Sequence, residues 1–208
     1  MTNTRSFPRG STPVIFQSLI HALNGRWHKR AMQIFMLIIL AHLSEHLFQG
    51  FQLWVLHWPR PQCLGVLGLF YPYLVHSEWL HYGHALFMLL GLALLRPAIT
   101  NLQALFWWNI AFAIQFWHHI EHALLLGQSL IHNNLYKFAA PVSIAQIVAQ
   151  YFSARPFTGQ PWLPRIELHL FYNLIVLIPM LIALRYHRFT QQSWLARPLV
   201  VWQANVAG

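Results

Sequence analysis

The sequence predicts an all-α integral membrane protein, a helical bundle of about four transmembrane helices with two short re-entrant or interfacial helices. Composition is the first observation behind this prediction, because 57% of the 208 residues are hydrophobic and only 8% are charged, as is typical of membrane proteins. The second is that four segments contain the roughly 20 mostly apolar residues that a helix needs to cross a bilayer. These segments cover residues 31–56, 76–95, 103–127 and 165–186.

Two shorter apolar stretches lie between these spans. Residues 63–75 and 138–152 are too short to cross a bilayer comfortably and are typical of re-entrant or interfacial helices. Before the first span, residues 11–23 predict an amphipathic helix on the membrane surface. We therefore expect a basic cytoplasmic or interfacial N-terminal segment at 1–30, a single transmembrane bundle at 31–190 and a C-terminal tail at 191–208.

The basic residues predict the orientation of the chain. The net charge is +9, and the basic residues lie at the ends of the apolar segments. This placement favours topology signals beside anionic lipid over nucleic-acid binding, which we do not expect because no recognition motif accompanies the charge. A cytoplasmic N-terminus, in a bacterial inner or plasma membrane, leaves most of the basic residues inside. The inner residues are Arg5, Arg9, Arg26, Lys29, Arg30, Arg96, Arg185, Arg188 and Arg197, and the outer ones are Arg60, Lys137, Arg155 and Arg165.

Ionisable side chains occur inside the predicted spans, where they are costly. The acidic residues of the chain are Glu45, Glu78, Glu121 and Glu167. A rise of about 1.5 Å per residue from the inner end of each span places all of them about 21 to 28 Å up, with histidines near the same level. The spans therefore deliver their acids and histidines to one layer, in the outer half of the bilayer.

Motif spacing places these residues on common helix faces. HLSEH at 42–46 and HHIEH at 118–122 share the pattern HxxEH, whose first His, Glu and last His lie on one helical stripe. SEWLH at 77–81 supplies Glu78 and His81, and His84 follows one turn later. In the last span, Glu167 and His169 are only two residues apart and should point in different directions.

The layout also predicts a tandem repeat. HLSEHLFQGFQ at 42–52 parallels HHIEHALLLGQ at 118–128 with an offset of 76 residues (122 − 46), and HYGHALFMLLGLALLR at 81–96 parallels HLFYNLIVLIPMLIALR at 169–185 with an offset of 88 (169 − 81). Each half would contain a span, a short interfacial helix and a second span, related by a pseudo-twofold axis along the membrane normal. The short helices would then roof the polar layer.

Carboxylates and imidazoles gathered in an apolar bundle predict a metal site. Four carboxylates in one layer repel one another unless they are protonated or neutralised, and we expect no Lys or Arg at that depth. Two divalent transition-metal ions would balance them, with iron favoured and zinc or manganese as alternatives. The candidate ligands are His42, Glu45, His46, Glu78, His81, His84, His118, His119, Glu121, His122, Glu167 and His169. Candidate partners that would orient the histidines are Gln49, Asn109, Gln115 and Asn173.

The histidine clusters resemble the histidine boxes of the integral-membrane di-iron desaturases and hydroxylases. The residues that carry this resemblance are His42, His46, His81, His84, His118, His119 and His122, and the resemblance implies that they bind iron, with His169 as an eighth ligand. It also implies O2-dependent attack on unactivated C–H bonds of a hydrophobic or lipid substrate, with an electron-donor protein and membrane lipids as partners. The chain departs from that class because it has no HxxHH box and because its predicted site lies in the outer half of the bilayer.

Two other functions fit the same residues. In a membrane zinc hydrolase, zinc would deprotonate a bound water near neutral pH with Glu45 or Glu121, our candidate catalytic residues, as the base. A non-catalytic haem or ion-handling subunit would use opposed histidines such as His46 and His122 as axial ligands, but haem gives no reason for the glutamates. Structural Glu–His pairing is the remaining alternative. Cys63 is the only cysteine, which excludes an internal disulfide and a cysteine-rich metal site.

Overall fold

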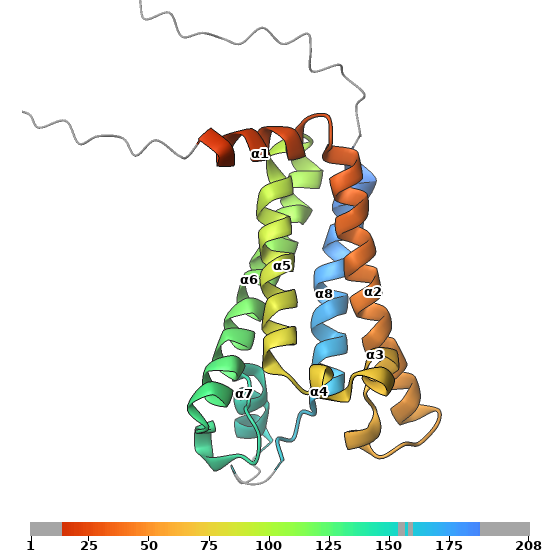
Figure 1. Cartoon of the computed structure of the whole chain (residues 1–208). Coiled ribbons are helices and arrows are strands. Elements are labelled where there is room, and N and C mark those ends of the chain that lie inside the picture. The colour runs from red at the N-terminus through yellow and green to blue at the C-terminus, as the bar shows by residue number, and fades with distance from the viewer. Residues whose placement is uncertain (1–13, 154–156, 158–159, 188–208) are drawn as a thin grey trace, which may run out of the picture.

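The structure, a computed structural model, describes residues 14–153, 157 and 160–187. Four long helices run side by side in an elongated bundle (Figure 1). They are α2 (His28–Trp54), α5 (Glu78–Leu95), α6 (Leu102–Ile131) and α8 (Arg165–Tyr186). Each lies within a few residues of one predicted span. The described residues contain no strand, so the predicted all-α class is confirmed.

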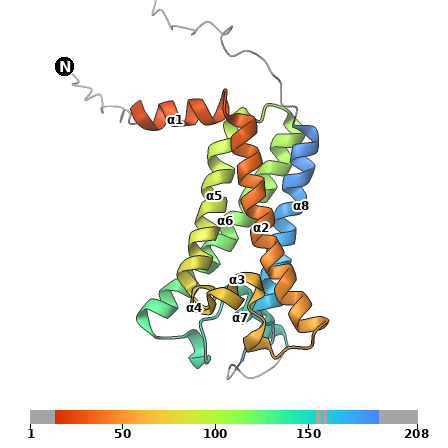
Figure 2. The ribbon, with the colours of Figure 1, turned by 45° about the vertical axis from the view of Figure 1, so that its right-hand side comes forward.

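Short helices cover both ends of the bundle. α1 (Val14–Asn24) lies across the end where α2 begins, and both views show it projecting sideways from the long helices (Figures 1 and 2). α3 (Gly65–Phe70), α4 (Pro72–Val75) and α7 (Ile144–Phe152) lie at the opposite end. Single turns of 3-10 helix occur at Arg60–Gln62, Arg96–Ala98 and Leu135–Lys137. The predicted tail at 191–208 lies outside the described residues.

Local signals explain where several helices begin. The Ser77 hydroxyl accepts a hydrogen bond from the backbone N–H of Trp79 at the start of α5, and the Asn101 side chain accepts one from Ala104 at the start of α6. Ser143 and Gln146 form a capping box at the start of α7. These side chains satisfy backbone N–H groups that have no partner inside the helix.

One apolar core joins the long helices in the part of the bundle nearer α1. Trp108 of α6 is fully buried there, and its indole N–H donates to the carbonyl oxygen of Leu92 on α5 at 2.8 Å. The core therefore contains no unsatisfied indole group. Its other main members are Met32, Phe35, Ile39 and Leu43 of α2, Met88 and Leu95 of α5, and Val176, Leu177 and Met180 of α8.

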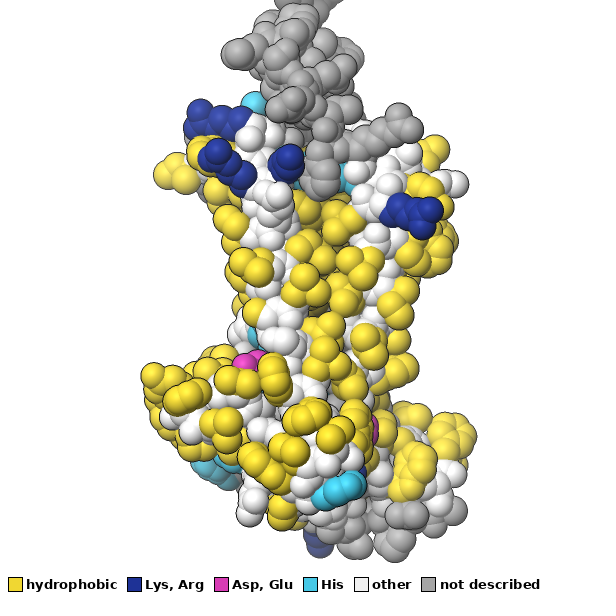
Figure 3. Space-filling model, turned by 90° about the vertical axis from the view of Figure 1, so that its right-hand side faces the viewer, with side chains coloured by type: hydrophobic (Ala, Val, Ile, Leu, Met, Phe, Trp, Pro, Cys, Tyr) yellow, Lys and Arg dark blue, Asp and Glu magenta, His cyan; other side chains and the backbone are white. Residues whose placement is uncertain are grey.

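Three of the described helices are long and apolar enough to cross a membrane: α2, α5 with the turn that follows it (Glu78–Ala98), and α8. Large hydrophobic side chains are exposed along them, such as Leu37, Leu90 and Ile178. Figure 3 shows exposed hydrophobic side chains over the middle of the bundle and most of the visible Lys and Arg near the end where α1 lies. This pattern is consistent with an integral membrane protein.

Replacing Gly91 by Ala should destabilise the contact between α2 and α5. A Cβ atom at Gly91 would collide with the aromatic ring of Phe35, which is itself buried in the core. Overpacking of this kind costs about 1–3 kcal/mol, so we expect Gly91→Ala to lower the unfolding temperature of the protein in detergent.

Gly83→Ala is the matched control, because a Cβ atom at Gly83 meets nothing within 4 Å on the same helix. Alanine also favours a helix interior over glycine by roughly 0.5–1 kcal/mol, so Gly83→Ala should leave the unfolding temperature unchanged or raise it. Equal losses in the two variants would contradict the close approach of Phe35 to α5.

Candidate functional site

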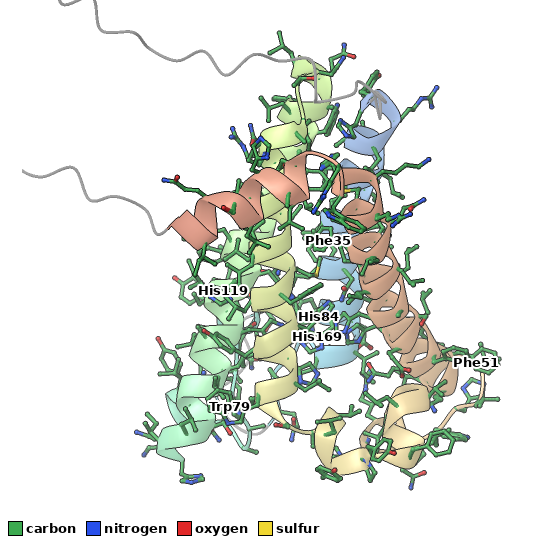
Figure 4. The ribbon with its side chains drawn as sticks, turned by 45° about the horizontal axis from the view of Figure 1, so that its top comes forward. Phe35, Phe51, Trp79, His84, His119 and His169 are labelled. Atoms are coloured by element: carbon green, nitrogen blue, oxygen red, sulfur yellow. The ribbon has the colours of Figure 1, made fainter. Side chains whose placement is uncertain are left out.

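Histidines from all four long helices line one small cavity beside the apolar core. Its volume is about 10 Å³, which is room for about one water molecule or ion. Figure 4 shows His84 and His169 pointing into the space between α5, α8 and α2. We call the following seven residues the histidine cluster. They are His42 and His46 of α2, His81 and His84 of α5, His118 and His122 of α6, and His169 of α8.

The imidazoles of the histidine cluster converge in pairs. The Nε2 atoms of His42 and His46 lie 3.1 Å apart, and those of His118 and His122 lie 3.2 Å apart. Both pairs have the spacing i, i+4, which places two side chains on one helix face. The ring centroid of His169 lies 5.1 Å from that of His46 and 5.4 Å from that of His122, so His169 stands between the two pairs.

Hydrogen bonds outside the cavity orient two of these rings. Nδ1 of His81 lies 2.9 Å from the carbonyl oxygen of Ser77, and Nδ1 of His46 lies 2.9 Å from Oε1 of Gln49. A carbonyl oxygen only accepts hydrogen bonds, so Nδ1 must carry the proton in both rings. Nε2 of each ring then carries a lone pair, as a metal-binding imidazole requires; in His46 this lone pair accepts a hydrogen bond from Nε2 of His42 at 3.1 Å.

Nε2 of His84 is buried and has no hydrogen-bond partner. A buried polar atom without a partner costs about 1–3 kcal/mol, so this atom marks a place where a ligand would gain a contact. As the side chains stand, however, the described residues contain no group of three or more His, Cys, Asp or Glu that could hold a metal ion. The donors are therefore gathered in pairs and not in a complete coordination shell.

The four glutamates do not line the cavity. Glu78 receives two hydrogen bonds from Arg165, at 2.6 and 2.8 Å, and Glu167 receives two from Arg60, at 2.9 and 2.7 Å. The expectation that no Lys or Arg lies at the depth of the carboxylates is therefore wrong. It failed because the sequence does not reveal how the ends of the helices fold relative to one another. Arg60 begins the 3-10 turn between α2 and α3, and Arg165 is the first residue of α8. Two of the four predicted carboxylate ligands are neutralised by guanidinium groups.

Glu45 and Glu121 bind backbone N–H groups of the short helices. Oε2 of Glu45 accepts from Leu67 in the first turn of α3 at 3.0 Å, and Oε1 of Glu121 accepts from Ala145 in the first turn of α7 at 2.8 Å. A carboxylate is favoured there, because the N-terminus of a helix carries unsatisfied N–H groups and a partial positive charge. Gly65 permits the contact at α3: its φ is +72°, and a Cβ atom would collide with the Glu45 carboxylate.

Two glutamines bind the backbone at or just before the first residue of the same short helices. Oε1 of Gln52 accepts from the N–H of Gly65 at 2.9 Å, and its Nε2 donates to the Gly65 carbonyl at 3.4 Å. Gln128 does the same at Val142, where Oε1 accepts from the N–H at 3.2 Å and Nε2 donates to the carbonyl at 2.8 Å. Gln52 and Gln128 are 76 residues apart, which is also the separation of Glu45 and Glu121.

Of His119 and the four residues predicted to orient the histidines, only Gln49 and Asn173 lie at the cavity or contact the histidine cluster. His119 does not line the cavity; its ring lies 5.1 Å from that of Tyr82, and Figure 4 shows it apart from His84 and His169. Gln49 contacts the histidine cluster as described, and Asn173 lines the cavity. Gln115 instead donates to the carbonyl of Ala85, and Asn109 accepts from Arg96.

Sequence reasoning missed Tyr172 as a member of the site. Its ring stacks on His118 with centroids 4.4 Å apart. The stack of His84 on His42, with centroids 3.5 Å apart, occupies the corresponding position on α2 and α5. The repeat offsets of 76 and 88 relate these two pairs, since 118 − 42 = 76 and 172 − 84 = 88. That alignment was the signal that could have found Tyr172.

Arg60 and Cys63, which lie outside the long helices, have shifted pKa values. The hydrogen bond with Glu167 raises the pKa of Arg60, so this guanidinium stays charged. Burial raises the pKa of the Cys63 thiol, against a smaller opposite effect of Arg60. Cys63 is therefore protonated near neutral pH and lacks the thiolate that a nucleophile or metal ligand needs.

Comparison with protein-family models, curated proteins and solved structures finds no match to this chain.

Replacing Arg165 by Met should destabilise the fold more than replacing Arg60 by Met. The side chain of Glu78 is only 6% exposed, so Arg165→Met leaves a buried carboxylate without a partner, a change that costs about 3–5 kcal/mol. The Arg60 pair is open to solvent, with the two side chains 48% and 27% exposed, and such pairs contribute about 0–1 kcal/mol. Thermal unfolding of both variants in detergent checks this, and equal losses would contradict the different burial of the two pairs.

Proposed function

We propose that this protein is an integral membrane metalloprotein in which the histidine cluster binds two transition-metal ions, and that it is a di-iron oxidoreductase acting on a hydrophobic or lipid substrate. The single observation that carries the proposal is the convergence of seven imidazoles from four helices on one small cavity. Imidazole is a normal ligand of iron, zinc and copper. No simple packing role requires seven polar rings inside an apolar bundle.

Donor spacing supports metal binding. With metal–nitrogen bonds of about 2.0–2.1 Å, two ligands of one ion lie about 2.9–3.4 Å apart in octahedral or tetrahedral geometry. The Nε2–Nε2 distances of 3.1 Å on α2 and 3.2 Å on α6 fall in this range. Each pair thus has the spacing of two ligands of one ion. Because the cavity of about 10 Å³ has room for about one ion, binding of two ions requires rings such as His84 and His169 to turn about their side-chain bonds.

Charge also supports two cations near the cluster. Glu45 and Glu121 directly precede His46 and His122 in the sequence, and their described partners are backbone N–H groups and, for Glu121, the Tyr172 hydroxyl. None of these partners carries a net charge. Two carboxylates therefore remain to offset cations held by neutral imidazoles, an arrangement that lowers the cost of burying the ions.

The same contacts favour an oxidoreductase over a zinc hydrolase. A hydrolase of the HxxEH type needs the glutamate as a base beside the metal-bound water. Glu45 and Glu121 are instead committed to the N-termini of α3 and α7 and are absent from the cavity lining. Imidazole suits iron as well as zinc and copper, and the resemblance to the histidine boxes of di-iron desaturases and hydroxylases supplies both the choice of iron and the reaction class. When bound, the iron pair would activate O2 for attack on a C–H bond.

Haem is a weaker alternative. A porphyrin needs an open slot between its two axial ligands. The space between His46 and His122 holds the ring of His169, whose centroid lies 5.1 and 5.4 Å from theirs. A cavity of about 10 Å³ also leaves no room for a macrocycle.

The proposal includes four crossings by α2, α5, α6 and α8 in two tandem halves. α6 has 30 residues and runs beside the three candidate spans. The equivalent glutamate and glutamine contacts at α3 and α7 support the repeat. The glutamates and the glutamines are each 76 residues apart, and their backbone partners are 78 (145 − 67) and 77 (142 − 65) residues apart. A cytoplasmic N-terminus follows from the basic residues at the α1 end. The histidine cluster then lies in the outer half of the bilayer.

Metal analysis of purified protein tests the proposal. We expect about two iron ions per chain, no Soret band, and loss of metal in His122→Ala because the ion at the pair formed by His118 and His122 loses a direct ligand. His119→Ala is the matched control, since His119 neighbours His118 in sequence but does not line the cavity, and it should keep its metal.

Glu121→Gln separates the two enzyme classes in the same measurement. We expect it to keep most of its metal, because Glu121 does not line the cavity. Wild-type protein without transition metal would refute the proposed function, and bound zinc with hydrolytic activity that disappears in Glu121→Gln would favour the hydrolase.

A further inference from the structure

A hollow beside the last turns of α6 is separate from the histidine cluster. It lies between residues 123–131 of α6 and residues 133–137 of the loop that follows, and we call it the α6 groove. Its volume is about 650 Å³, within the range of roughly 300–1,000 Å³ that is usual for small-molecule sites. It shares no lining residue with the histidine cavity. Figure 1 shows these turns of α6 at the end of the bundle opposite α1.

The helix side of the α6 groove is apolar. Four of its lining residues repeat at intervals of three or four positions and so share one face of α6; they are Ala123, Leu124, Gly127 and Ile131. Ile131 is 69% exposed, and a Cβ atom at Gly127 would meet nothing within 4 Å. An apolar hollow on a bundle that exposes hydrophobic side chains to a membrane suits a hydrocarbon chain as its occupant.

The loop side of the α6 groove is polar and positively charged. Asn133 and Lys137 are among its lining residues. Both ion pairs between described side chains involve arginines, so Lys137 has no acidic partner among the residues that the structure describes. An ammonium group beside an apolar groove favours a ligand that joins a hydrocarbon chain to a negative charge.

Contacts and backbone conformation hold the loop in place. Oε1 of Gln128 accepts a hydrogen bond from the N–H of Leu135 at 3.0 Å, and the ring centroids of Tyr136 and Phe157 lie 5.0 Å apart. The φ angles of Tyr136 and Lys137 are +51° and +58°, a left-handed conformation that bulky residues adopt only where the surrounding structure imposes it. A loop that is already fixed loses little entropy when a ligand binds.

We infer that the α6 groove binds an anionic phospholipid of the surrounding bilayer, with an acyl chain along residues 123–131 and the headgroup phosphate beside Lys137. Lysines near the ends of membrane helices attract anionic headgroups. A second copy of this chain suits the groove less well, because its net charge of +9 would be repelled by the Lys137 side. The inference depends on the groove alone and is independent of metal binding by the histidine cluster.

Photolabelling of the full-length protein tests the inference. The protein is reconstituted into phosphatidylcholine vesicles that contain phosphatidylglycerol with a diazirine on its acyl chain, irradiated, digested and mapped by mass spectrometry. We expect more label at residues 123–131 than on the exposed faces of α2 and α8. A phosphatidylcholine probe with the same diazirine chain should show no such excess. Lys137→Asn should reduce the excess about fivefold, the effect of roughly one lysine beside an anionic lipid surface, and asparagine tolerates the left-handed backbone.

Gly127→Leu should also remove the excess, because its side chain fills the groove. Gly83→Leu is the matched control: a Cβ atom at Gly83 likewise meets nothing within 4 Å, but Gly83 does not line the groove, so this variant should keep the wild-type labelling. Label spread evenly over the long helices, or an unchanged excess in Lys137→Asn or Gly127→Leu, would overturn the inference. A wild-type dimer that shields residues 123–131 from the lipid probe would overturn it as well.

Discussion

The arrangement of the whole bundle depends on the cost of placing polar groups among apolar side chains. An imidazole or carboxylate inside such a bundle requires a partner for nearly every polar atom. The described glutamates meet this demand in two ways, through guanidinium groups or through backbone N–H groups at helix ends. Among the histidines, His42 pairs with His46 and His118 pairs with His122, whereas Nε2 of His84 and Nδ1 of His118 and His122 have no hydrogen-bond partner. This division separates the acids from the histidines, although the two residue types alternate in the same sequence motifs.

Sequence periodicity predicted the long helices because length and hydropathy determine them almost alone. Short motifs also pointed to six of the seven histidines that line the cavity, and the helix that parallels α5 pointed to His169. The contacts of the Glu45 and Glu121 carboxylates were not predictable in this way. The HxxEH stripe correctly places them on the same helix as His46 and His122, but one residue of separation turns a side chain by about 100°. That angle directs each glutamate toward a short helix and not toward the cavity.

Long-range pairing explains the remaining errors. Arg60 and Arg165 contact glutamates that are 107 and 87 residues away in the sequence, and no local pattern encodes such partners. Tyr172 shows the opposite case. Its ring stacks on His118 at the position where the aligned halves place His84 in the first half. A search for metal ligands does not consider a tyrosine at such a position. Comparing the two halves position by position is thus more informative than examining either motif separately.

The order in which the contacts occur along the chain has a consequence for biosynthesis. Glu45 and Gln52 precede α3, and Glu121 and Gln128 precede α7. Each short helix can therefore dock on residues already made when it leaves the ribosome. The partner of Glu78 is Arg165, which is synthesised 87 residues later. Every nascent chain therefore passes through an interval in which the acid at the start of α5 is unpaired. Assembly of the bundle is complete only when its last long helix is inserted.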